Sequence, residues 1–65
     1  MYRKLKMEMA RVGWNIKELA ENTGITYSTL TGKVRGDTPF TLDECVLVKR
    51  ALGSTLELEE LFARQ

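Results

Sequence analysis

The 65-residue chain contains no histidine, one cysteine and one proline. A single cysteine excludes an internal disulfide, which is typical of a protein from a reducing compartment. No apolar run approaches the length of a membrane span, and the N-terminal stretch MYRKLKMEMA lacks the apolar segment of a signal peptide. These features predict one small domain that works in the cytoplasm.

The lack of histidine also argues against an enzyme, because histidine is the usual proton carrier near neutral pH and a common metal ligand. The sequence shows no glycine loop that would cradle a phosphate and no cluster with metal-ligand spacing. Cys45 lies on an apolar helical stripe, where a structural role is expected rather than a nucleophilic one. We therefore expect no catalytic site, metal, cofactor or small-molecule ligand.

The charge is small overall but unevenly distributed. The net charge is +1, yet residues 1–36 hold seven basic and three acidic side chains, whereas residues 37–65 hold three basic and six acidic ones. The first half is therefore basic and the second half acidic. A basic half is the kind of surface that attracts a polyanion such as DNA.

Helix start and stop signals recur along the chain. Asn15 and Thr41 are each followed three positions later by glutamate, which is the pattern of a capping box, and Thr26 is a third cap candidate without such an acid. Glycines 13, 24, 36 and 53 stand where helices should end. The pattern predicts helices at residues 2–12, 16–22, 27–35 and 42–52, and a short fifth helix within 55–63.

Each predicted helix carries one apolar stripe at helical spacing. The one run that alternates like a strand, TLELEEL, has no second strand to pair with. The fold class expected is all-α, with five short helices around one core. The segments 16–22 and 27–35, joined by a tight turn at Gly24, form a helix-turn-helix unit.

The second helix of this unit has the shape to enter the major groove of DNA, where its first residues would meet base edges. Leu30 and Val34 fall on one side of that helix, and Ser28, Gly32 and Arg35 fall on the other. The residues expected to contact bases are Thr26, Tyr27, Ser28, Thr31 and Gly32.

Gly32 is an unusual choice inside a helix, since glycine costs about 1 kcal/mol there relative to alanine. Two explanations stay open at this point. Either the helix backbone must approach a base pair closely, or the glycine relieves a crowded contact with a neighbouring helix.

Contacts to the phosphate backbone are expected from polar and basic side chains around the unit. The start of the first helix offers free N–H groups to a phosphate. The residues expected to contact phosphate are Asn15, Lys17, Lys33, Arg35 and Arg11. Such contacts position a protein on DNA without reading its sequence.

The stretch NIKELAENTGITYSTLTGKVRG resembles the helix-turn-helix of the Cro/C1-type (XRE-like) regulators of phages and bacteria. The following GDTPFTLDECVLVKRALG resembles the glycine, loop and fourth helix of the same family, and TLTGKVRG followed by FTL is similar to a subgroup of very small phage regulators. The resemblance spans residues 5–62. It implies a lambda-repressor-like domain in a bacterial host cell, acting as a homodimeric repressor on a partly palindromic operator. The family often has glutamine where this chain has Ile16.

The surface for self-association is expected on the fifth helix, at Leu58, Leu61 and Phe62, which carry more apolar area than a short terminal helix easily hides. Two alternatives stay open for these residues: they complete the core of the monomer, or they bind a different protein. The latter would make the chain a small interaction module that antagonises another regulator. Leu47 on the fourth helix is a second candidate for the dimer surface.

Overall fold

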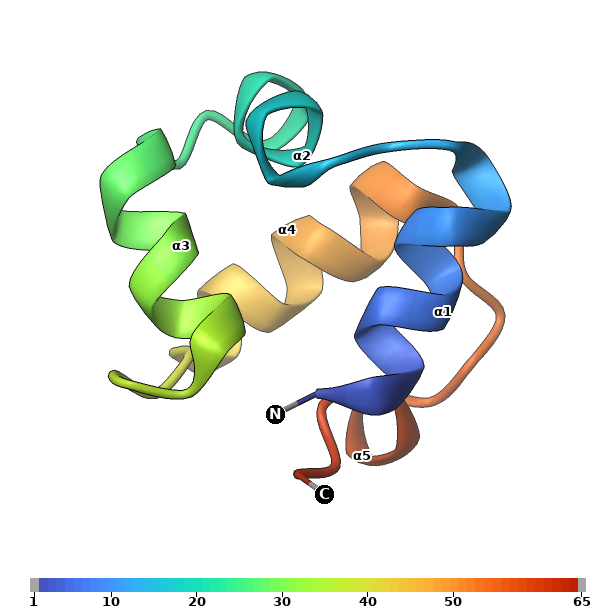
Figure 1. Ribbon diagram of the computed structural model, residues 1–65. Helices are drawn as coiled ribbons and strands as arrows, with labels where there is room; N and C mark the ends of the chain where they lie inside the picture. Colours follow the sequence, from blue (N-terminus) through green and yellow to red (C-terminus); the bar gives the residue numbers. More distant parts are fainter. Residues whose placement is uncertain (1, 65) are drawn as a thin grey trace.

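The computed structural model describes residues 2–64, and within them it contains five helices and no strand. Figure 1 shows them surrounding one centre, with both ends of the chain close to α5. The helices are α1 (Arg3–Val12), α2 (Ile16–Thr23), α3 (Tyr27–Arg35), α4 (Leu42–Leu52) and α5 (Leu58–Leu61). The predicted all-α class and the bounds of α3 and α4 are confirmed. The first helix begins one residue later than predicted, and the second ends one residue later.

Capping chemistry explains where α2 and α4 begin. Asn15 accepts a hydrogen bond from the Glu18 amide at 2.9 Å, and the Glu18 carboxylate accepts one from the Asn15 amide at 3.0 Å. Thr41 and Glu44 make the same reciprocal pair at the start of α4. Each box satisfies two amides that have no partner within their helix. Both predicted capping boxes are confirmed.

The first four helices end at the predicted glycines, all of which have a positive φ. The position that matters most is Gly24, where φ is +80° between α2 and α3. A side chain with a Cβ rarely adopts this backbone conformation. Gly24 therefore allows α2 to stop and the chain to turn sharply into α3.

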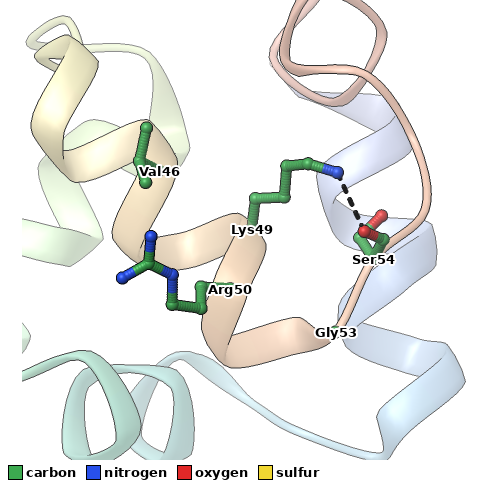
Figure 2. Close-up of a pocket in the computed structure, with 5 residues that line it drawn as sticks. All are labelled: Val46, Lys49, Arg50, Gly53 and Ser54. Carbon is green, nitrogen blue, oxygen red and sulfur yellow. Dashed lines mark hydrogen bonds between the residues drawn. The ribbon is translucent and has the colours of Figure 1, made fainter.

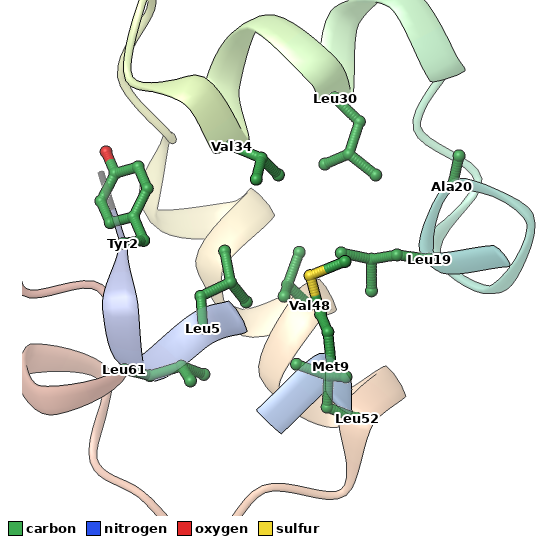
Figure 3. Close-up of a cluster of buried hydrophobic side chains, with 10 residues drawn as sticks. All are labelled: Tyr2, Leu5, Met9, Leu19, Ala20, Leu30, Val34, Val48, Leu52 and Leu61. Carbon is green, nitrogen blue, oxygen red and sulfur yellow. The ribbon is translucent and has the colours of Figure 1, made fainter. Parts of the chain in front are cut away.

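The core is formed by the apolar stripes of all five helices. Figure 3 shows Leu30 and Val34 of α3 pointing toward Val48 of α4, with Leu5 of α1 and Leu19 of α2 completing the centre. Each of these five side chains is at most 1% exposed. Because α3 is attached to the core on one side only, its opposite side is free to face a partner.

Leu61 belongs to this core, since it is fully buried. Its predicted place on a dimer surface is therefore wrong, and the alternative that it completes the monomer core is correct. The physical reason is that α5 packs against α1 and α4, so its leucine fills part of the core between them. Leu58 and Phe62 are only partly buried.

Three aromatic rings from the two end regions of the chain and from the loop before α4 pack together, those of Tyr2, Phe62 and Phe40. The ring of Phe62 packs edge-on against Tyr2 and Phe40, with ring centres 6.0 and 4.9 Å apart. Arg64 lies over the Tyr2 ring at 5.8 Å, and it donates a hydrogen bond to the Gly36 carbonyl at 3.0 Å. The end of the chain thus holds the end of α3 in place.

None of the helices between residues 2 and 64 combines the length and the apolar character that crossing a membrane would require.

Candidate nucleic-acid interface

The turn between α2 and α3 is held in place by buried side-chain contacts. The buried hydroxyl of Thr23 donates a hydrogen bond to the Leu19 carbonyl at 2.8 Å and accepts one from the Ile25 amide at 3.3 Å. Ile25 also packs against the core. These contacts fix the direction in which α3 leaves α2, so that α3 stands at one side of the molecule, as Figure 1 shows.

The outer face of α3 is polar and accessible. Tyr27 is 56% exposed, and Ser28 and Arg35 are also exposed. Within residues 2–64 the Ser28 hydroxyl makes no hydrogen bond, so it is free to donate and to accept. The predicted division of the helix into an inner face with Leu30 and Val34 and an outer face is confirmed.

The threonine hydroxyls near the start of α3 are partly engaged. The Thr26 hydroxyl donates to the Thr29 hydroxyl at 2.8 Å, and the Thr31 hydroxyl donates to the Tyr27 carbonyl at 2.8 Å. The Thr31 hydroxyl can therefore still accept a hydrogen bond, but its proton is already donated to the Tyr27 carbonyl. Thr26 stands at the N-cap position as predicted, but its side chain does not cap the helix. Unlike α2 and α4, α3 thus starts without a side-chain cap.

Gly32 lies in the middle of the outer face and is not crowded. A Cβ built there would meet only the Thr38 hydroxyl, at 3.8 Å, which is an ordinary contact distance. The backbone of Gly32 also has no positive φ. Neither packing nor backbone geometry within the described chain requires a glycine, so the explanation by a crowded helix contact does not hold.

Two cations stand on either side of this face. Lys17 is exposed in the first turn of α2, and Arg35 is exposed in the last turn of α3. Arg35 lies 3.9 Å from the Asp37 carboxylate, but both side chains are more than 60% exposed, so water weakens this pair strongly. Both cations remain available to an external anion.

A family model described as helix-turn-helix matches residues 5–58. The chain belongs to this helix-turn-helix family, of the Cro/C1 type. The match runs from within α1 to the first residue of α5 and includes the α2–α3 unit. No curated protein and no solved structure matches the chain. The helix-turn-helix protein is therefore a DNA-binding regulator, with α2 and α3 as its helix-turn-helix.

Lys33, predicted to contact phosphate, is instead engaged inside the helix-turn-helix protein. Its ammonium lies 3.0 Å from the Glu44 carboxylate and donates to the Pro39 carbonyl at 2.9 Å. Its side chain is only 12% exposed. The prediction is wrong because the loop after α3 folds back and surrounds the ammonium with acceptors, so Lys33 ties α3 to α4.

Arg11, also predicted to contact phosphate, is engaged in a similar way. Its guanidinium donates to the Leu52 carbonyl at 2.9 Å and pairs with Glu8 at 3.2 Å. It therefore covers the end of α4, where helix carbonyls lack partners. Half of the Arg11 side chain is nevertheless exposed, so its phosphate contact stays a prediction.

The Lys33–Glu44 pair makes stability depend on pH. The Thr41 amide, and after it the Lys33 ammonium, hold the pKa of Glu44 below its ordinary value of 4.5. A carboxylate with a lowered pKa stabilises the fold fully above its unfolded pKa, and this contribution is lost as the pH falls through the folded value. We expect the free energy of unfolding to decrease below pH 4.5, and to decrease less in Glu44→Gln.

Glu44→Gln is the suitable variant for this prediction because its amide oxygen can still accept from Thr41, so only the charge is removed. At pH 7 it should lose about 1 kcal/mol of stability, as expected for a partly buried pair. Urea unfolding of both proteins between pH 3 and 7 measures the difference. Parallel pH profiles for the two proteins would show that Glu44 does not carry the effect.

Two residues near the interface, Ile16 and Thr29, were not among the site residues predicted from the sequence. Ile16 opens α2 and, together with Asn15, Lys17 and Tyr27, lines a hollow of about 550 Å³ between the starts of α2 and α3. Thr29 is exposed beside Ser28. The signals were present, since Ile16 stands where the family often has glutamine, and Thr29 stands where a capping box would have its acid.

A second hollow, of about 430 Å³, lies on α4 and contains none of the predicted site residues. Figure 2 shows Lys49 reaching from α4 toward Ser54, and its ammonium donates to the carbonyls of Ser54 and Leu56 at 2.9 and 2.7 Å. Arg50 points away from them. Lys49 therefore holds the loop between α4 and α5 in place, and this structural contact explains the hollow.

Proposed function

We propose that this helix-turn-helix protein is a sequence-specific repressor of the phage Cro/C1 type that binds a partly palindromic operator as a homodimer. The single observation that carries the proposal is the outer face of α3, where Tyr27 and Ser28 are exposed beside an uncrowded Gly32. A helix with side chains at its start and an open backbone in its middle suits a close approach to base edges.

In this proposal α3 is the recognition helix, and its residues Tyr27 and Ser28 read bases directly. Thr26 lies at the edge of the contact, and Thr31 contributes as an acceptor and through its methyl group. Gly32 brings the helix backbone close to the bases. Because the major groove presents both hydrogen-bonding groups and thymine methyl groups, small hydroxyl side chains and one phenol can distinguish base pairs there.

In this proposal the phosphate contacts are made by Lys17, Arg35 and Asn15, because the Arg11 guanidinium already binds the Leu52 carbonyl and Glu8. Lys17 and Asn15 stand at the start of α2, where the helix dipole favours an anion. Arg35 lies at the opposite end of α3, so the cations would grip the backbone on both sides of the base contacts. Such contacts contribute affinity that does not depend on sequence.

The homodimer surface in this proposal has two candidate locations. Leu58 and Phe62 remain from the predicted surface, and both are only partly buried. Leu47 on α4 is 43% exposed and is the alternative. Two recognition helices related by a two-fold axis would explain a palindromic operator.

The test compares variants on two duplexes, one from the DNA flanking the protein's own gene and one of random sequence. We expect Tyr27→Ala and Ser28→Ala to reduce the preference for the flanking duplex about fivefold or more, since a base contact contributes about 1–3 kcal/mol of discrimination. Lys17→Ala should weaken binding to both duplexes by about the same factor. Band-shift titrations at two salt concentrations give these affinities.

Lys6→Ala is the matched control for Lys17→Ala, because Lys6 is also exposed but lies on α1, across the core from α3. It should leave both affinities nearly unchanged. Unchanged discrimination in Tyr27→Ala would mean that α3 is oriented differently in the groove. Complete absence of DNA binding would favour the alternative of an interaction module.

A further inference from the structure

The hollow between α2 and α3 has two different kinds of wall. Ile16 and Tyr27 provide apolar surface, and Asn15 and Lys17 provide polar groups. Ile16 is partly buried and also packs against the core, so its position is fixed, whereas Tyr27 is 56% exposed. The Asn15 side-chain oxygen already accepts from the Glu18 amide at 2.9 Å. The hollow therefore offers mainly an apolar contact.

The location of the hollow restricts what can enter it. It opens between the first residues of the recognition helix and the start of α2, which is where a base edge and its neighbouring phosphate would lie in the proposed complex. The only apolar substituent that a base presents in the major groove is the 5-methyl group of thymine. An amino group of adenine or cytosine placed against Ile16 would lose its water without gaining an acceptor.

We propose that this hollow receives the 5-methyl edge of a thymine and that Ile16 is a specificity-determining residue. The inference rests on the proposed function, because it concerns the same DNA complex. The methyl group contacts Ile16 and the ring of Tyr27, while Lys17 at the rim reaches the phosphate of the same strand. The operator then contains a thymine at this position in each half-site.

Removing only the methyl group tests this directly. The purified protein first selects its preferred duplex from a random-sequence library. Each thymine of that duplex is then replaced in turn by deoxyuridine, which keeps the base pairing and lacks the methyl. We expect one position per half-site at which the replacement lowers the affinity of the unaltered protein about fourfold, as expected for the burial of one methyl group.

The assignment to Ile16 is tested with two variants. In Ile16→Ala the deoxyuridine replacement at that position should change the affinity less than twofold, and in Ile16→Val the loss should be intermediate. Because Ile16 packs against the core, thermal unfolding must show that each variant is folded at the assay temperature. Leu42→Ala is the control, since Leu42 is 70% exposed on α4 and outside the hollow; it should keep the fourfold loss.

The possible outcomes separate the two proposals. If the protein selects a duplex but no deoxyuridine position lowers its affinity, the methyl contact is wrong and the proposed function stands. If the loss persists in Ile16→Ala, the methyl group is bound elsewhere and the assignment to Ile16 is wrong. If no duplex is selected at all, the proposed function fails together with the inference.

Discussion

Thr29→Glu is expected to weaken DNA binding about 30-fold or more while making the folded protein slightly more stable. Thr29 occupies the third position of α3, which is where Glu18 and Glu44 complete the capping boxes of α2 and α4. The substitution would give Thr26 the same reciprocal partner, which contributes about 1 kcal/mol. The added carboxylate would, however, face the phosphates of the groove, and like charges brought together in an interface cost several kcal/mol.

Thr29→Gln is the matched control, because glutamine can complete the same capping box without a charge. Its stability should rise as in Thr29→Glu, and its affinity for DNA should change less than fivefold. Thermal unfolding and fluorescence anisotropy with a labelled duplex measure both properties. Equal affinities for the two variants would mean that the start of α3 does not face DNA.

Gly32→Ala should separate stability from binding in a similar way. Alanine is favoured over glycine inside a helix by about 1 kcal/mol, and the added Cβ meets only the Thr38 hydroxyl at 3.8 Å. The melting temperature should therefore rise. If the helix backbone approaches the bases at this point, the added methyl group must displace the helix, and we expect the affinity for DNA to fall about tenfold or more.

The control for Gly32→Ala is Ser28→Ala, which removes a hydroxyl from the same face without adding bulk. It should lower discrimination between duplexes and leave general affinity for DNA almost unchanged. A variant Gly32→Ala that is more stable and binds DNA as tightly as before would exclude a close approach of the α3 backbone to the bases.

The elements of the fold were predictable because their signals are local. Capping boxes at Asn15 and Thr41 fix helix starts through contacts between residues three positions apart, and glycines such as Gly24 fix the ends through their own backbone conformation. The inner face of α3 followed from the spacing of Leu30 and Val34. These signals depend on near neighbours only, so the three-dimensional fold is not needed to read them.

The parts of the site that failed depend on distant residues. Lys33 meets Glu44 and Pro39 only because the loop after α3 folds back. Leu61 shows the same limit, since an apolar stripe does not say whether a partner or the chain's own core covers it. A sequence pattern gives the type of side chain, and the fold decides whether that side chain is free.

The most direct test of the DNA-binding face of α3 is the affinity for a random-sequence duplex, measured by fluorescence anisotropy over a range of salt concentrations. With Lys17 and Arg35 as the side-chain phosphate contacts, the logarithm of the binding constant should fall against the logarithm of the salt concentration with a slope of about −2 per protomer. In Lys17→Ala the slope should become less steep, from about −2 to about −1, and in Lys6→Ala it should remain unchanged. No binding at low salt, or binding with the same slope in Lys17→Ala as in the unaltered protein, would contradict the placement of DNA against α2 and α3.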